Sequence, residues 1–131
     1  LNEYEHLMGD ELTAYFYYRR EQAEMQCRMF QQAVDDIDRA IRMEPKEPLY
    51  HAERAVVYYR IGEFAEALSS AKKSAELNPE FGDAYRLMGI CQLKLNRREE
   101  GLAHLKKAAE LGDESAQAIL QSEEAGNGEK P

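Results

Sequence analysis

Apolar and small residues recur every three or four positions along most of the chain, which is the spacing of one face of an α-helix. The spacing is clearest in the second half of the stretch 47–79, at Phe64, Ala67, Leu68, Ala71, Ala75 and Leu77. The first half has a similar stripe, and Gly62 separates the two halves. The pattern predicts two helices joined by a turn. Because each helix has only one apolar stripe, the pair needs neighbouring helices to cover it.

The same arrangement occurs once before this stretch and once after it. A shift of 34 residues brings like residues into register: Tyr17, His51 and Tyr85; Ala33, Ala67 and Gly101; Ala40, Ser74 and Ala108; Pro45, Pro79 and Asp113. A period of this length is typical of solenoids built from stacked helical hairpins. The pattern therefore predicts three hairpins and, with a further helix at the end, seven helices of about a dozen residues each.

The middle unit resembles the tetratricopeptide repeat family in both spacing and residue type. The residues that carry the resemblance are His51, Ala55, Tyr58, Gly62, Ala67, Ser74 and Pro79. The first unit departs from the family pattern because Glu21 and Glu24 occupy its small-residue and tyrosine positions. The third unit departs at three positions, Gln92, Gly101 and Asp113. The resemblance covers 14–113 and implies an all-α, right-handed superhelix, in which the first helix of each hairpin lines a concave groove that binds protein.

The turn signals divide the chain into segments. We expect an N-terminal segment at 1–13, three repeats at 14–47, 48–81 and 82–113, a capping helix at 114–125 and a disordered tail at 126–131. The N-terminal segment is expected to be partly helical, and either packs on the first hairpin or lies as an apolar arm in the groove. The residues expected to cover the end of the stack are Ala116, Ile119 and Leu120. Asn96 suits the third turn because asparagine tolerates the left-handed conformation. Arg28 stands where the second turn has Gly62, so the first turn must form without glycine's access to positive φ.

Bulk composition narrows the function. The chain has 25 acidic and 17 basic residues and a net charge of −8, whereas binding to a phosphate backbone requires a basic face, so nucleic acid is not expected as a partner. No apolar run approaches the roughly 20 residues needed to cross a bilayer, and we expect no membrane insertion. Cys27 and Cys91 lie at different repeat positions and are expected to stay unpaired. The compartment stays open between the cytoplasm and, if a signal peptide precedes Leu1, an extracytoplasmic location.

No catalytic or metal-binding pattern is evident in the sequence. His6, His51 and His104 have no partner at metal-ligand spacing, and His51 occupies an aromatic packing position. Adjacent acidic residues such as Asp35 and Asp36 point about 100° apart on a helix, so they cannot act as paired catalytic carboxylates. A glycine-rich phosphate loop is also missing. We expect no enzyme activity, no cofactor and no bound metal.

One pair of oppositely charged residues is a candidate structural contact. Arg20 lies next to the small-residue position of the first unit, and Asp36 follows sixteen residues later on the opposing helix. We predict that they form an ion pair that fixes the angle between the two helices. The alternative is that Arg20 only lays its alkyl stem along the apolar stripe.

The resemblance also implies which side chains line the groove. The corresponding positions are Tyr15, Tyr18, Gln22, Met25 and Gln26 in the first unit; Leu49, Ala52, Val56, Tyr59 and Arg60 in the second; and Asp83, Arg86, Ile90, Leu93 and Lys94 in the third. From the residues alone, these are the side chains left over once each helix has placed its stripe in the core. The apolar members then form an exposed row, Met25, Val56, Tyr59, Ile90 and Leu93. The basic members form one cluster, Arg60, Arg86 and Lys94.

This surface predicts a non-catalytic module that binds a protein or peptide with an apolar face and one or more carboxylates. Tyrosine and arginine dominate binding energy at interfaces, so the expected hot spots are Tyr18, Tyr59 and Arg86. A subclass of the family grips the terminal carboxylate of chaperone tails with lysine, asparagine and arginine. Those positions here are Tyr18, Gln22, Glu53, Asp83 and Leu87. The clamp is therefore absent, which disfavours a chaperone-tail adaptor.

Several alternatives remain open at the level of the sequence. The groove could be filled by residues 1–12 of the chain itself, or a homodimer could form through it. The repeats could also be a structural segment of a longer array, or a regulatory part of an enzyme whose catalytic part lies before Leu1.

Overall fold

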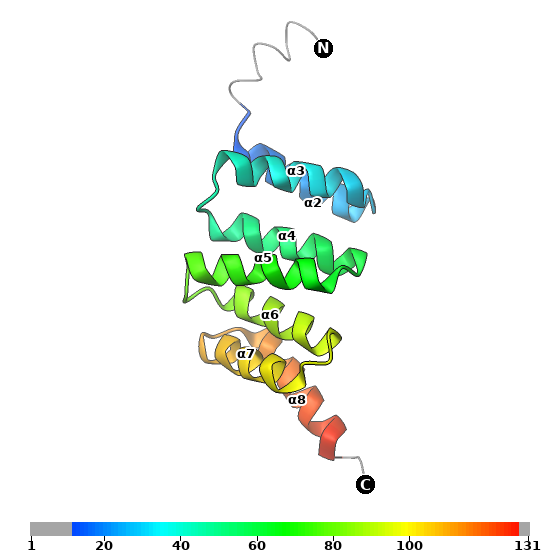
Figure 1. The fold of residues 1–131 in the computed structure, drawn as a ribbon, viewed down its shortest axis with the longest axis vertical. Helices are drawn as coiled ribbons and strands as arrows, with labels where there is room; N and C mark the ends of the chain where they lie inside the picture. The colour runs from blue at the N-terminus through cyan, green and yellow to red at the C-terminus, as the bar shows by residue number, and fades with distance from the viewer. Residues whose placement is uncertain (1–11, 129–131) are drawn as a thin grey trace, which may run out of the picture.

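The computed structural model describes residues 12–128, and the expectations for residues 1–11 and 129–131 lie outside the described part. The helices in this range are α2 (Ala14–Gln26), α3 (Phe30–Met43), α4 (Pro48–Ile61), α5 (Phe64–Leu77), α6 (Gly82–Lys94), α7 (Arg98–Glu110) and α8 (Glu114–Gly128). They pair into hairpins α2–α3, α4–α5 and α6–α7, which follow one another along the long axis of the molecule with α8 at the end (Figure 1). The predicted all-α solenoid of three hairpins and a C-terminal helix is confirmed.

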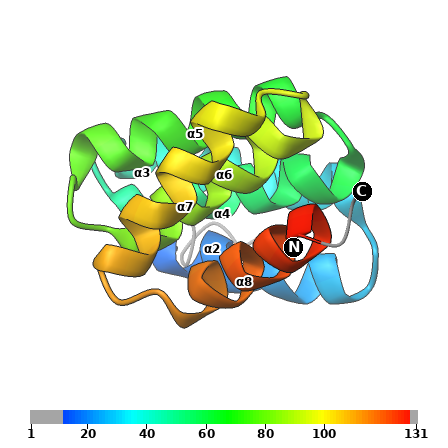
Figure 2. The same cartoon turned by 90° about the horizontal axis from the view of Figure 1, so that it is seen from below.

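The hairpins repeat at a constant interval and in one direction. Their first helices begin at Ala14, Pro48 and Gly82, which reproduces the 34-residue period of the sequence. Seen along the stack, α3 and α5 lie on one side of the molecule and α2 and α8 lie on the other (Figure 2). Within residues 12–128, no helix is both long and apolar enough to cross a membrane.

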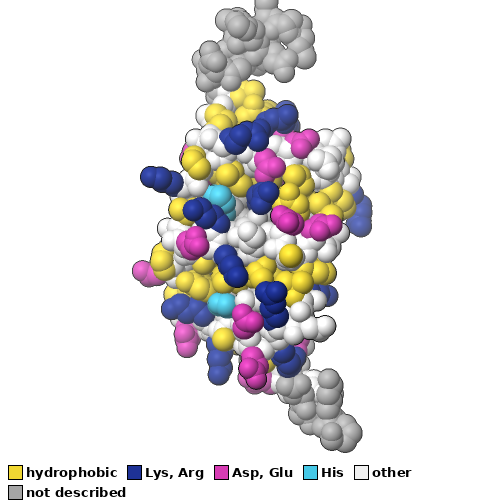
Figure 3. All heavy atoms as spheres, in the orientation of Figure 1, with side chains coloured by type: hydrophobic (Ala, Val, Ile, Leu, Met, Phe, Trp, Pro, Cys, Tyr) yellow, Lys and Arg dark blue, Asp and Glu magenta, His cyan; other side chains and the backbone are white. Residues whose placement is uncertain are grey.

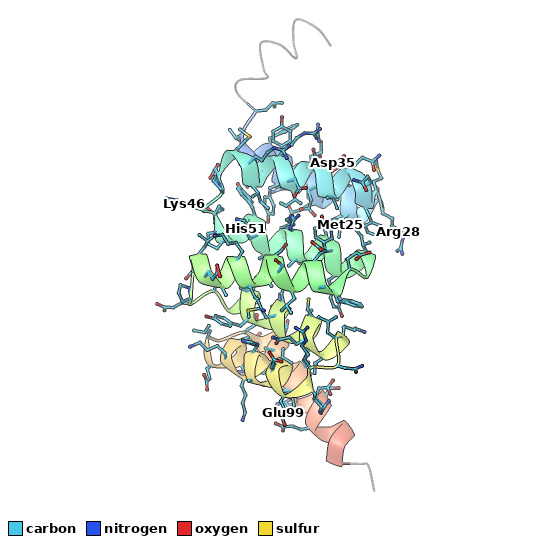
Figure 4. All side chains as sticks on the ribbon, in the orientation of Figure 1. Met25, Arg28, Asp35, Lys46, His51 and Glu99 are labelled. Carbon is cyan, nitrogen blue, oxygen red and sulfur yellow. The ribbon has the colours of Figure 1, made fainter. Side chains whose placement is uncertain are left out.

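The three hairpin turns share one backbone conformation. Arg28, Gly62 and Asn96, at equivalent repeat positions, all have positive φ angles of 60°, 94° and 62°. In each turn, the next N–H donates to the carbonyl five residues earlier, at distances of 2.8 to 2.9 Å: Met29 to Glu24, Glu63 to Tyr58 and Arg97 to Gln92. The first turn thus forms without a glycine, as expected, but it keeps the positive φ of the other two turns. Arg28, labelled in Figure 4, adopts the left-handed conformation at a cost of about 1–2 kcal/mol, because the turn's hydrogen bonds require it.

The two helices of a hairpin approach each other most closely at the small-residue positions. A Cβ atom added to Gly89 on α6 would lie 2.6 Å from the Leu105 Cγ and 2.8 Å from the Gly101 carbonyl on α7. The equivalent residues of the second hairpin, Ala55 and Ala67, are fully buried. Glycine and alanine thus let these helices pack almost backbone to backbone.

Neighbouring hairpins share apolar clusters that join the stack into one body. The largest cluster joins α4, α5 and α6. At the C-terminal end, Ala116 is buried against Leu105 and Ala108, and half-buried Ile119 and Leu120 pack beside it. The backbone N–H of Ala116 also donates to the Asp113 carboxylate at 2.8 Å, which caps the start of α8. Helix α8 continues to Gly128, so the predicted disordered tail is wrong for residues 126–128.

The predicted ion pair between Arg20 and Asp36 is present. Arg20 Nε and Nη2 donate to the two oxygens of Asp36 at 2.6 and 2.8 Å, and Arg39 Nη1 adds a bond of 2.7 Å. Burial alone would raise the pKa of Asp36, but hydrogen bonds from Arg20, Glu24 and Arg39 lower it below its ordinary value. The pair therefore connects α2 to α3 through a buried carboxylate.

The second hairpin uses the equivalent arginine differently. Ser70 stands in the place of Asp36, and Arg54 donates to the Ser70 hydroxyl at 2.8 Å. Arg54 also donates to Asp38 on α3 at 2.8 Å, so it links the second hairpin to the first. Both members of the Arg54–Asp38 pair are about a third exposed, at 28% and 32%.

We predict that Asp36→Ala lowers the free energy of unfolding by about 2–4 kcal/mol, because it removes a buried carboxylate on which two arginines converge. Asp38→Ala is the matched control, and it should cost less than about 1 kcal/mol because its ion pair is partly exposed. Urea denaturation at pH 7, followed by circular dichroism, measures both. Equal losses in the two variants would contradict the structural role of Asp36.

Candidate functional site

The residues predicted to line the groove differ widely in exposure. We call the surface that they form on α2, α4 and α6 the inner face. Its exposed members are Tyr15, Gln26, Arg60, Asp83 and Lys94, and its half-buried members are Tyr18, Gln22, Leu49, Val56, Tyr59, Arg86, Ile90 and Leu93. Met25 and Ala52 are buried. Met25 packs with Ala33 and Val57 between the first two hairpins, so its placement in an exposed row is wrong (Figure 4).

The remaining apolar row stays partly accessible. Three of its side chains pack with one side against the large cluster of α4, α5 and α6, namely Val56, Tyr59 and Ile90. Leu93 packs against the C-terminal cluster that contains Leu105 and Ala116. The Tyr59 ring also meets Phe64 edge-on, with 5.4 Å between ring centroids. Each of these side chains is thus held in place by the core while part of its surface reaches solvent.

Aromatic side chains gather where α2 meets α4. The ring centroids of Tyr15 and Tyr18 are 5.9 Å apart, and those of Tyr18 and Tyr50 are 5.5 Å apart. Gln22 Nε2 donates to the Tyr18 hydroxyl at 3.1 Å. The pKa of Tyr18 is raised by burial and then by the nearby carboxylates of Glu53 and Glu21. This corner of the inner face therefore combines aromatic rings with negative charge.

The predicted basic cluster is not a set of free cations. Arg86 pairs with Asp113, in the loop before α8, and with Asp83 on its own helix. The Arg60 guanidinium lies 5.8 Å from the centre of the Phe30 ring. Lys94 is exposed and forms no ion pair within residues 12–128. The guanidinium of Arg86 thus holds the loop before α8 and is not free to bind a ligand carboxylate.

Glu21 is the most unusual residue at this site. It occupies the small-residue position of the first hairpin and is completely buried, and neither carboxylate oxygen has a hydrogen-bond donor within the described residues. Burial, the charge of Glu53 and a hydrogen bond to Glu53 raise the pKa of Glu21 to about 9. An ionised pair of carboxylates can only accept hydrogen bonds. Protonated Glu21 can donate to Glu53, so the neutral form of Glu21 is the one that fits this site.

Glu24 and Asp36 form a second pair of neighbouring acids. One oxygen of Glu24 is buried without a partner, and burial, followed by the hydrogen bond to Asp36 and its charge, raises the pKa of Glu24 to about 7. The sequence indicated Glu21 and Glu24 as departures from the repeat pattern but did not predict that they pair with other acids. The missed signal is Glu53 on α4, a further acidic residue that lies on the side of the second hairpin facing the first.

Other hollows lie away from the inner face. One cavity of about 360 Å³ lies between α7 and α8 and includes Leu102, Leu120 and Glu123 in its lining. A shallower depression of about 460 Å³ spans α5 to α7 and includes Tyr85 and His104. The face drawn in Figure 3 intersperses basic and acidic side chains among apolar ones, without a patch of one sign. No group of three or more potential metal-ligating side chains occurs among the described residues.

The two described histidines have structural hydrogen bonds. His51 Nε2 donates to the Pro45 carbonyl at 2.8 Å, which ties α4 to the preceding linker. His104 Nδ1 accepts from the Gln92 amide at 2.7 Å once the amide nitrogen is turned towards the ring. Both cysteines are unpaired, with Cys27 exposed and Cys91 buried.

We predict that stability falls as the pH rises from about 5 to 9. The folded state holds a proton on Glu21, whose pKa is raised from 4.5 to about 9, while the unfolded chain has lost that proton. Because the folded state binds more protons in this window, stability falls by up to about 1.4 kcal/mol for each pH unit between the two pKa values. Glu24 contributes in the lower part of the window, up to about pH 7.

The isosteric variant Glu21→Gln serves as the control for this prediction. It should be more stable than the parent at pH 9 and nearly equal at pH 5, because a neutral amide replaces the carboxyl and can donate to Glu53. Urea denaturation at pH 5, 7 and 9 gives the difference between the two proteins, in which other titrating groups cancel. An identical pH dependence in both proteins would show that Glu21 does not carry the effect.

Comparison with known proteins shows which family this chain resembles. The sequence profile described as Tetratricopeptide repeat matches residues 48–81, which include the α4–α5 hairpin. The chain is 28% identical over 87 residues to Small glutamine-rich tetratricopeptide repeat-containing protein 2 of Mycosarcoma maydis, covering 66% of this chain and 25% of the relative. It is 29% identical over 104 residues to Protein SGT1 homolog of Bos taurus, covering 77% and 31%. The chain thus spans a quarter to a third of these relatives.

A solved structure agrees at the level of the fold. The first tetratricopeptide repeat domain of Spaghetti (RPAP3), bound to the HSP90 peptide SRMEEVD, matches with a TM-score of 0.79 at 22% identity, covering 84% of this chain and 89% of that chain. The period, the repeated turn conformation, the profile match and this fold agree with one another. Residues 48–81 thus match the tetratricopeptide repeat, and the chain has the fold of tetratricopeptide repeat domains.

Proposed function

We propose that this chain is a non-catalytic protein-interaction module that holds a peptide segment of a partner protein against its inner face. The observation that carries the proposal is the row Val56, Tyr59, Ile90 and Leu93, whose side chains are fixed by the core yet partly exposed. Rigid helices hold these side chains before the partner arrives, so little conformational entropy is lost on binding. The peptide-bound domain of RPAP3, which shares this fold, supports the proposal.

The proposed contact set keeps most of the residues suggested by the sequence. It consists of Tyr15, Tyr18, Gln22, Val56, Tyr59, Arg60, Ile90, Leu93 and Lys94. Met25 leaves the set because it is a core residue, and Arg86 leaves it because two aspartates already engage its guanidinium. The partner would present an apolar face to the row and a carboxylate to exposed Lys94.

The structural hydrogen bonds of the two described histidines support the proposal that the module is non-catalytic. Both described histidines use a ring nitrogen to hold the fold, His51 through a backbone carbonyl and His104 through Gln92. The buried acids lie between helices and contact one another. Binding through exposed apolar and aromatic surface is the activity that the described side chains serve best.

Selection from a phage library of random 12-residue peptides tests the proposal. Peptides enriched by the parent protein should bind the variant Tyr59→Ala about thirtyfold more weakly, since an aromatic hot spot contributes about 2 kcal/mol or more. Tyr58→Ala is the matched control. Tyr58 precedes Tyr59 on α4, is also half-buried and packs against the same cluster, but its ring contacts Arg54 and is not part of the inner face.

The control variant should bind the selected peptides within about threefold of the parent, as measured by fluorescence anisotropy, with folding checked by circular dichroism. No enrichment of peptides by the parent protein, or equal weakening by the two tyrosine variants, would reject the inner face as the binding surface.

We predict that the acidic peptide SRMEEVD binds this chain more weakly than about 1 mM. Two of the positions that a carboxylate clamp would use hold Glu53 and Asp83, which repel an acidic peptide, and a third holds Leu87, which is buried. Fluorescence anisotropy with the labelled peptide at low ionic strength measures this. Micromolar binding would contradict the assignment and restore a chaperone-tail role.

A further inference from the structure

Two acidic side chains, Glu21 and Glu53, meet at the α2–α4 corner of the inner face. Glu21 is fully buried and without a donor, and it faces half-buried Glu53 on the next hairpin. The arginines of the neighbouring helices are engaged elsewhere. Arg19 lies over the Tyr15 ring and donates to the Tyr15 hydroxyl. Arg20 and Arg39 converge on Asp36, and Arg54 binds Asp38 and Ser70. Glu53 therefore forms no ion pair within residues 12–128.

Aromatic surface borders the same corner. The Tyr18 ring lies close enough to Glu53 for that carboxylate to disfavour ionisation of its hydroxyl. Tyr15, 55% exposed, lies one turn earlier on α2, with its ring centroid 5.9 Å from that of Tyr18. Aromatic faces attract cations and also cover the alkyl stem of a long basic side chain. A carboxylate beside tyrosine rings is thus a surface suited to a cationic group.

We propose that Glu53, backed by Glu21 and bordered by Tyr18 and Tyr15, receives a lysine or arginine side chain of the bound peptide. This inference rests on the proposed function, because it assigns one subsite of the same inner face. A charge-assisted hydrogen bond to Glu53 gives the basic group a partner. Behind it, the protonated carboxyl of Glu21 can donate to the second oxygen of Glu53 and hold that carboxylate in place. The half-buried Glu53 is the member of the pair that a ligand can reach.

The subsite would give the inner face a polarity. Its acidic end lies between the first two hairpins, and exposed Lys94 lies on the third. A peptide with a basic residue at one end and an acidic residue at the other matches both ends in only one direction. The charges thus select the orientation of the peptide, while the apolar row between them supplies contact area.

The peptides selected from the random 12-residue library provide the test. We expect lysine or arginine to be enriched at one position among peptides selected by the parent protein. Selection by Glu53→Gln should lose this preference while keeping the apolar one. Glu66→Gln, which removes an exposed carboxylate from α5, is the matched control and should keep the basic preference. Glu53→Gln should fold, since the amide oxygen can still accept from the protonated carboxyl of Glu21, and a thermal melt checks this.

A second measurement requires no protein variant. In the most enriched synthetic peptide, replacement of the basic residue by norleucine should weaken binding to the parent protein at least tenfold. Apolar peptides selected without a basic preference, or unchanged affinity after the norleucine replacement, would overturn the subsite while leaving the proposed function in place. Failure to enrich any peptide would overturn both.

Discussion

The close approach of two helices within each hairpin is the constraint on which this structure depends. In the third hairpin, Gly89 and Gly101 bring the backbones so near that a single added methyl group would clash. Ala55 and Ala67 serve the second hairpin in the same way. The same contact between the two helices of a hairpin recurs every 34 residues, and the hairpins stack because each presents the same surfaces to the next.

The first hairpin meets this constraint with a residue that does not suit it. Glu21 occupies the crossing position, and its side chain extends to Glu53 on α4 instead of packing as a small group. Close to this crossing, the Asp36 carboxylate on α3 is held by Arg20 of α2 and by Arg39, and so connects α2 to α3. An apolar contact in the other hairpins has become a polar network here, and protonation of its buried acids replaces the missing donors.

This network borders the proposed binding surface. Glu53 belongs both to the buried acid pair and to the corner where Tyr18 and Tyr15 reach solvent. A polar group that lowers the stability of the free protein can thereby serve recognition, since a partner's cation would supply the charge that the fold leaves out. The same geometry connects the proposed binding surface to the packing of the first hairpin on the second.

Periodicity was enough to predict the hairpins and the order of the helices, because repeated apolar stripes have few other solutions. The sequence also predicted the Arg20–Asp36 pair, whose members are local to one hairpin. It failed where partners come from distant elements. Arg86 binds Asp113 across 27 positions, and Met25 is covered by the following hairpin. Arg28 shows a further limit, since the hydrogen bonds of the turn outweigh the residue's own conformational preference.

The central claim is that the first hairpin contains a neutral carboxyl group at its helix crossing. A carbon-13 NMR titration of the glutamate side-chain carboxyl signals tests it most directly, with Glu21→Gln used to assign the Glu21 resonance. The account predicts that this resonance keeps the chemical shift of the protonated acid at pH 7 and titrates near pH 9. A midpoint near the ordinary value of 4.5 would contradict it.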